Sequence, residues 1–162
     1  MCKKVFRIVF WVLTVLIMVL IFMFSSQEAV NSQNTSEGFT KKILSLSNKF
    51  NSLTELEQQN IIVNVQYYVR KAAHFSVFAS LGLCLFSAIN LTFKNRFLWL
   101  YSFIISVLYA ISDEIHQLFV LGRSCRIGDM FIDSMGALSG ILIVLIIITL
   151  YKYKKTKKAV QN

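Results

Sequence analysis

The feature that most constrains the fold of this chain is a set of four long apolar runs, at residues 5–24, 72–93, 97–119 and 134–151. Each run approaches the roughly 20 apolar residues that a helix needs to cross about 30 Å of hydrocarbon. One small bundle accounts for all four runs. The sequence therefore predicts an all-α, polytopic membrane protein with four transmembrane helices, forming a single domain over residues 1–162.

The composition excludes a soluble fold. Hydrophobic residues make up 56% of the chain and charged residues only 15%, and the mean hydropathy is +0.60. A soluble domain could not cover that much apolar surface. The three cysteines form neither a disulfide framework nor a metal quartet, because Cys84 falls within a span and Cys125 in a loop.

The distribution of charge predicts the orientation in the membrane. Ten basic residues and no acid occur in the N-terminal segment, the 94–96 loop and the tail 152–162, whereas all eight acids occur elsewhere. By the positive-inside rule, both termini lie in the cytoplasm of a multi-pass protein of the cell membrane. The net charge of +9 is then a topology signal, and no nucleic-acid partner is expected.

The third run is too short to span unless its helix continues into polar sequence. Its purely apolar part, Phe97 to Ile111, has 15 residues and a length of about 22 Å. Continued to Phe119, the helix carries acidic and amide side chains into the outer part of the membrane. Such groups are costly in lipid, so they should face the bundle interior or a wet pocket.

Polar residues also occur at the outer ends of the other spans, which predicts one site open to the extracytoplasmic side. The candidate cluster comprises Ser26, Gln27, Arg70, Lys71, His74, Asp113, Glu114, His116, Gln117, Arg123, Arg126, Asp129 and Asp133. In the fourth span, Gly136 and Gly140 follow the last two aspartates on one helical face. This Gly-x-x-x-Gly pair predicts close packing against a neighbouring helix. A second copy of the chain, in a homo-oligomer, is the alternative partner for this face.

The outer insert, residues 28–67, contains an amphipathic pattern. Phe39, Ile43, Leu46 and Phe50 recur at helical spacing, which predicts one helix lying at the membrane surface. The stretch from Ser52 to Glu55 has capping-box spacing and predicts the start of a second helix that leads into the second span.

Three motifs in this chain resemble the VanZ-like family of bacterial membrane proteins. They are FSSQ (24–27), RKAAHFSVFASLG (70–82) and SDEIHQLFVLGRSCRIGDMFIDSMGALSG (112–140). The resemblance implies an association with reduced susceptibility to lipoglycopeptide antibiotics such as teicoplanin. It also implies that the family's polar positions fall on every residue of the cluster above except His116 and Arg126. Gly136 is a further family position. Two residues depart from the family pattern: Phe78 stands where a tyrosine is usual, and Leu121 replaces a common proline.

Three interpretations of the cluster remain open. The arginines Arg70, Arg123 and Arg126 could bind an anionic lipid or lipid-linked cell-wall precursor bidentately, oriented by the four acids. The cluster could instead be an enzyme site, with Asp113 or Glu114 as base and a histidine, His74 or His116, assisting. In the third interpretation, the acids only neutralise the arginines in a structural network.

No cofactor is expected. Asp113 and His116 are spaced as metal ligands on a helix, but nearby arginines would repel a cation, so no metal site is expected either. The expected partners are membrane lipids and, through the arginines, an envelope precursor.

Overall fold

The computed structural model describes residues 2–161, which form six helices and no strand. The helices are α1 (Cys2–Ser25), α2 (Ala29–Leu44), α3 (Asn48–Asn51), α4 (Glu55–Thr92), α5 (Leu98–Gln117) and α6 (Ile127–Gln161). Four of them, α1, α4, α5 and α6, are long and apolar enough to cross a membrane. The prediction of an all-α, polytopic membrane protein is confirmed.

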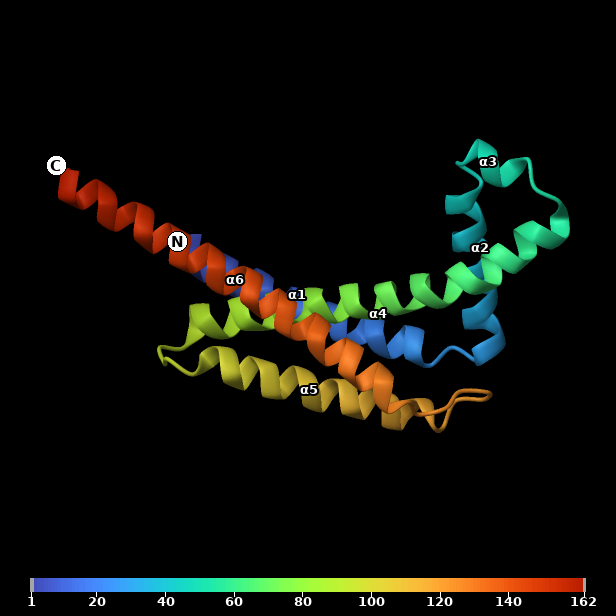
Figure 1. Cartoon of the computed structure of the whole chain (residues 1–162). Helices are drawn as coiled ribbons and strands as arrows, with labels where there is room; N and C mark the ends of the chain where they lie inside the picture. The colour runs from blue at the N-terminus through green and yellow to red at the C-terminus, as the bar shows by residue number, and fades with distance from the viewer. Residues whose placement is uncertain (1, 162) are drawn as a thin grey trace.

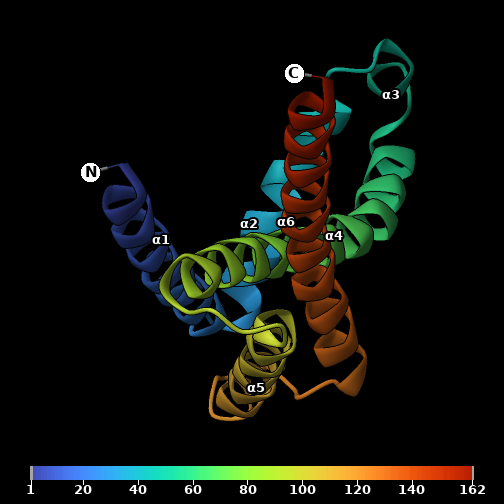
Figure 2. The same cartoon turned by 90° about the vertical axis from the view of Figure 1, so that its left-hand side faces the viewer.

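Helix α4 contacts each of the other three spanning helices (Figures 1 and 2). The four helices form a bundle whose polar end is the end at which α1 and α5 stop and α6 begins. Helices α2 and α3 and the first turns of α4 extend beyond this polar end (Figure 1). Many apolar side chains on the outside of the bundle are exposed, as expected of surfaces that face lipid.

The most extensive contact in the bundle joins α4 and α6, and glycines make it possible. Gly136 and Gly140 of α6 lie against the backbone of α4 at Phe75 and Ala79, and Gly82 of α4 lies against Ala137. A Cβ at Gly140 would meet the Leu83 amide nitrogen at 2.8 Å, which no side chain tolerates. The Gly-x-x-x-Gly face is therefore occupied within the chain, by α4.

Helix α4 is one continuous helix of 38 residues, about 57 Å long, so it exceeds the hydrocarbon thickness by several turns. It begins with a capping box made by Thr54 and Glu57, two residues later than the predicted pair. The prediction of a box at Ser52 and Glu55 is wrong, because Ser52 ends α3 and its hydroxyl donates to the Lys49 carbonyl.

The prediction of a single surface helix over residues 39–50 is also wrong. Helix α2 ends at Leu44, and Leu46 lies in a turn with 86% of its surface exposed. Phe50 belongs to α3 and is buried. The break is held by hydrogen bonds within the turn, because the Ser45 hydroxyl donates to Lys42 and the Asn51 amide donates to the Ser45 carbonyl.

Candidate functional site

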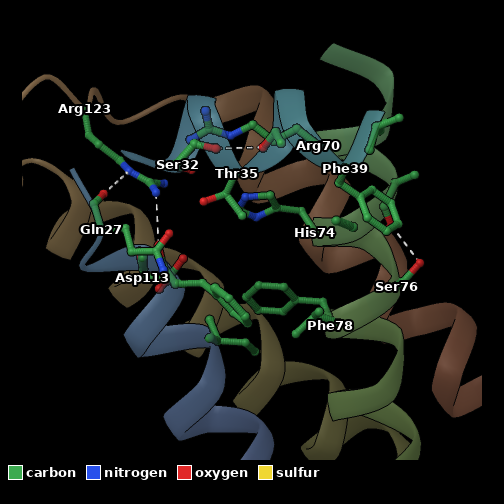
Figure 3. A pocket seen from close by; sticks show the side chains of 18 of the residues that line it. Gln27, Ser32, Thr35, Phe39, Arg70, His74, Ser76, Phe78, Asp113 and Arg123 are labelled. Atoms are coloured by element: carbon green, nitrogen blue, oxygen red, sulfur yellow. Dashed lines mark hydrogen bonds between the residues drawn. The ribbon is translucent and has the colours of Figure 1, made fainter. Parts of the chain in front are cut away.

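A pocket of about 630 Å³ lies at the polar end of the bundle. Its walls come from the end of α1, the inner face of α2, the middle of α4, Asp113 of α5 and Arg123 of the α5–α6 loop (Figure 3). Most of the lining is apolar or carries a hydroxyl group. Among the charged and titratable side chains, the pocket brings together Arg70, His74, Asp113 and Arg123.

Arg123 ties the α5–α6 loop to the end of α1. Its guanidinium donates to the carbonyl oxygens of Gln27 (2.9 Å) and Phe24 (3.0 Å), and to the side-chain oxygen of Gln117 (3.4 Å). Burial lowers the pKa of Arg123, and the nearby positive charge of Arg70 lowers it further, while Asp113 and Glu114 raise it. The cation is therefore partly desolvated beside a second cation, an arrangement that a bound anion would relieve.

Arg70 is the freer of the two pocket arginines. Among residues 2–161, its side chain takes part in no hydrogen bond or ion pair, and it is only partly buried. It lies in the upper part of the pocket, above His74 in the view of Figure 3. Its donors are therefore available to a ligand.

Arg126 does not line the pocket. Its side chain is exposed and reaches only the hydroxyl of Ser124, at 3.4 Å. Its contribution to the polar end is its backbone amide, which donates to Glu114 Oε2 at 2.9 Å. The three arginines grouped from the sequence thus separate into two that share the pocket and one outside it.

The four acids separate as well. Asp129 pairs with Lys71, whose ammonium also lies over the Tyr67 ring. The other three, Asp113, Glu114 and Asp133, form a carboxylate cluster, with 4%, 0% and 0% of their surface exposed. One ligand oxygen from each lies within 4.8 Å of the others.

Among the described residues, no arginine forms an ion pair with any of these acids. The ion pairs found there are Lys71 with Asp129, and His74 Nδ1 with Asp133 Oδ1 at 3.6 Å. A structural network in which the acids neutralise the three arginines is therefore not what this end of the bundle contains.

The two histidines have different surroundings. His74 lines the pocket and reaches toward Asp133 on α6. His116 faces α1 instead, where its Nε2 lies 3.1 Å from the Ser26 hydroxyl and its ring stacks on Phe22. Ser26 and His116 are thus a pair outside the pocket, whereas Gln27 lines it and Gln117 donates to Asp113 at 3.1 Å.

Sequence reasoning missed the part that α2 plays in this site. Ser32, Thr35 and Phe39 of α2 line the pocket (Figure 3), and so does Ile43. The amphipathic spacing of the last two was visible in the sequence, but it indicates only that they share a face. It does not show which other helix that face covers.

A family model described as VanZ/LLP1 matches residues 10–148. This range takes in every residue of the pocket and of the carboxylate cluster, and parts of all four spanning helices. Comparison with curated proteins and with solved structures finds no significant match.

Proposed function

This chain belongs to the VanZ/LLP1 family, and on that premise we propose that it binds an anionic lipid or a lipid-linked cell-wall precursor in the cell envelope. Through this binding it reduces susceptibility to teicoplanin-type lipoglycopeptides. One observation carries the proposal: two arginines, Arg70 and Arg123, stand in a pocket whose remaining lining is mainly apolar.

The pocket suits a molecule with an anionic head and an apolar tail. Its volume of about 630 Å³ falls within the roughly 300–1,000 Å³ typical of ligand sites. Arginine presents a planar set of donors that matches phosphate and carboxylate oxygens. Phe24, Phe39 and Ile43 line the pocket and are also exposed, so an acyl or prenyl chain could enter from the bundle surface.

The charge distribution supports a pocket that faces outward. The basic tail of α6 and the 94–96 loop lie at the opposite end of the bundle, and by the positive-inside rule this supports a cytoplasmic position for that end. The polar end then lies in the outer leaflet, where wall precursors are displayed and where lipoglycopeptides act.

The decisive experiment measures lipid binding by the delipidated, detergent-purified protein. Native mass spectrometry would be used with phosphatidylglycerol and a polyprenyl phosphate as probes, and with phosphatidylcholine as the zwitterionic comparison. We expect both anionic lipids to bind more tightly, and Arg70→Gln to weaken their binding at least tenfold. That factor corresponds to one lost charge-assisted hydrogen bond, about 1.5–3 kcal/mol.

Arg126→Gln is the matched control, because it removes the same charge at the same end of the bundle but outside the pocket. Its affinity for anionic lipid should equal that of the wild type. Arg123→Gln tests the second pocket arginine, with thermal unfolding measured alongside because this side chain also holds the loop to α1. Equal binding by wild type and Arg70→Gln would refute the proposal.

The link to resistance is tested in a susceptible Gram-positive host. Wild-type protein should raise the minimum inhibitory concentration of teicoplanin, and Arg70→Gln, at equal membrane abundance, should not. Abundant wild-type protein that leaves susceptibility unchanged would refute the resistance role while leaving the lipid-binding result intact.

A membrane enzyme that modifies the same lipid or precursor is the second candidate function. It is favoured by one observation, that Asp113 and His74 line the pocket beside the two arginines. An enzyme that uses Asp113 as base should lose protection in Asp113→Asn while still binding lipid. A binding protein that holds its ligand through the two arginines alone should retain protection in that variant.

A further inference from the structure

The carboxylate cluster, formed by Asp113 and Glu114 of α5 and Asp133 of α6, has no lysine or arginine within ion-pair distance among the residues described. Its side chains are at most 4% exposed. The nearest titratable partner is His74, whose Nδ1 lies 3.6 Å from Asp133 Oδ1. Three ionised carboxylates this close repel one another, and burial adds a desolvation cost, so some positive charge must accompany them.

The hydrogen bonds of the cluster leave its inner oxygens without partners. Gln117 donates to Asp113 Oδ2, and the Arg126 amide donates to Glu114 Oε2. In contrast, Glu114 Oε1 and both oxygens of Asp133 are buried without a hydrogen-bond partner. Buried polar atoms are rarely left in this state. The two donors thus orient two of the ligands from outside, as is usual around a metal site.

We propose that Asp113, Glu114 and Asp133 bind one divalent cation of the kind that prefers oxygen ligands, such as Ca²⁺ or Mn²⁺. The ligand oxygens lie within 4.8 Å of one another. Two oxygens that bind the same Ca²⁺ lie at most about 4.6–5.2 Å apart. The upper limit of 4.8 Å on the spacing of the three oxygens is therefore compatible with one shared ion.

The arginines do not oppose this site in the way that the sequence suggested. Arg123 directs its guanidinium to the carbonyl oxygens of Phe24 and Gln27, and the exposed side chain of Arg126 reaches the Ser124 hydroxyl. His116, the other expected partner of Asp113, faces α1.

 The close packing of the α6 glycine face on α4 carries Asp133 to the two acids of α5.

The cation site adjoins the lipid pocket through Asp113, which belongs to both. A cation held there would lie at the pocket wall, where an oxygen of a bound phosphate could complete its coordination. This role rests on the proposed function, whereas binding of the cation itself does not.

The test uses the full-length protein in detergent, stripped with a chelator and titrated with Mn²⁺ at pH 7.5. Free Mn²⁺ is followed by electron paramagnetic resonance, and Ca²⁺ is then added as competitor. We expect one Mn²⁺ per chain, displaced by Ca²⁺, and an affinity at least tenfold lower in both Glu114→Gln and Asp133→Asn. Glu37→Gln, which removes an acid of α2 outside the cluster, should bind as the wild type does.

Two results would overturn the cation site. One is a monodisperse wild-type protein that binds no Mn²⁺ at about 1 mM, which would mean that protons compensate the cluster. The other is unchanged binding in both amide variants. If Asp133→Asn fails to fold, Glu114→Gln and the wild-type titration still decide the question. Lipid binding measured in the presence of chelator keeps the two proposals separate, because Arg70→Gln tests the lipid site without reference to the cation.

Discussion

Replacing Gly140 by alanine should destabilise the bundle, because this glycine lies where α6 approaches the backbone of α4. A Cβ at this position would lie 2.8 Å from the Leu83 amide nitrogen, and closer still to the Ala79 carbonyl oxygen. Ordinary van der Waals contact begins at 3.4 Å, so the contact with Leu83 alone requires the two helices to separate by about 0.6 Å, and the closer contact with Ala79 requires more. Neither neighbour is a flexible side chain that could move aside.

The cost of that separation is shared along the whole α4–α6 contact. A gap of about 0.5–1 Å removes a quarter to a half of the dispersion energy of the atoms concerned. Overpacking of this kind costs about 1–3 kcal/mol, and the better helix propensity of alanine returns up to about 1 kcal/mol. Because the closest contact places the cost at the upper end of that range, we expect Gly140→Ala to lower the free energy of unfolding by about 2–3 kcal/mol.

Reversible unfolding in mixed detergent micelles would measure this change. Gly128→Ala is the matched control, since it lies in the same helix with nothing within 4 Å of the added Cβ. This control should be neutral or slightly stabilising. If Gly140→Ala proved as stable as Gly128→Ala, the argument from close backbone approach would be refuted.

Two further changes test local features of the fold. Thr54→Ala removes the capping hydroxyl of α4, so it should lower the free energy of unfolding by about 1 kcal/mol and speed hydrogen exchange in the first turn of that helix. Ser52→Ala, the control, should leave that turn protected. Lys71→Met and Asp129→Asn should each destabilise the polar end by about 1 kcal/mol, because each removes one partner of an ion pair. A double-mutant cycle should give a favourable coupling energy between the two residues. Additive effects would show that the pair contributes nothing to stability.

The helical class and the number of spanning helices could be predicted because they depend on local sequence alone. In hydrocarbon, every backbone group must be satisfied within the segment, so an apolar run of sufficient length becomes a helix regardless of its neighbours. The helix boundaries in the insert could not be predicted as well. Ser52 and Thr54 both have suitable partners three residues later, and only the end of α3 decides that Thr54 is the cap.

The membership of the candidate site was predicted only in part. Placing polar side chains at one end of the bundle follows from the cost of burying them in lipid. Their division into smaller groups does not follow, as Arg126 shows: its charge and position resemble those of Arg123, yet its side chain lies outside the pocket. The loop path between α5 and α6, which includes Gly122 with a φ of 74°, decides which arginine turns inward.

The amino-acid sequence alone thus determined that the polar groups gather at one end of the bundle, since desolvation acts on every residue separately along its helix. The tertiary structure decided which groups meet, because that depends on how each helix is rotated and how closely its neighbours approach. Arg123 meets one carbonyl group in the last turn of α1 and one just beyond that helix, which lie 99 and 96 residues away in the chain. Asp133 joins Asp113 and Glu114 because glycines let α6 pack tightly against α4, and no periodicity within a single helix carries that information.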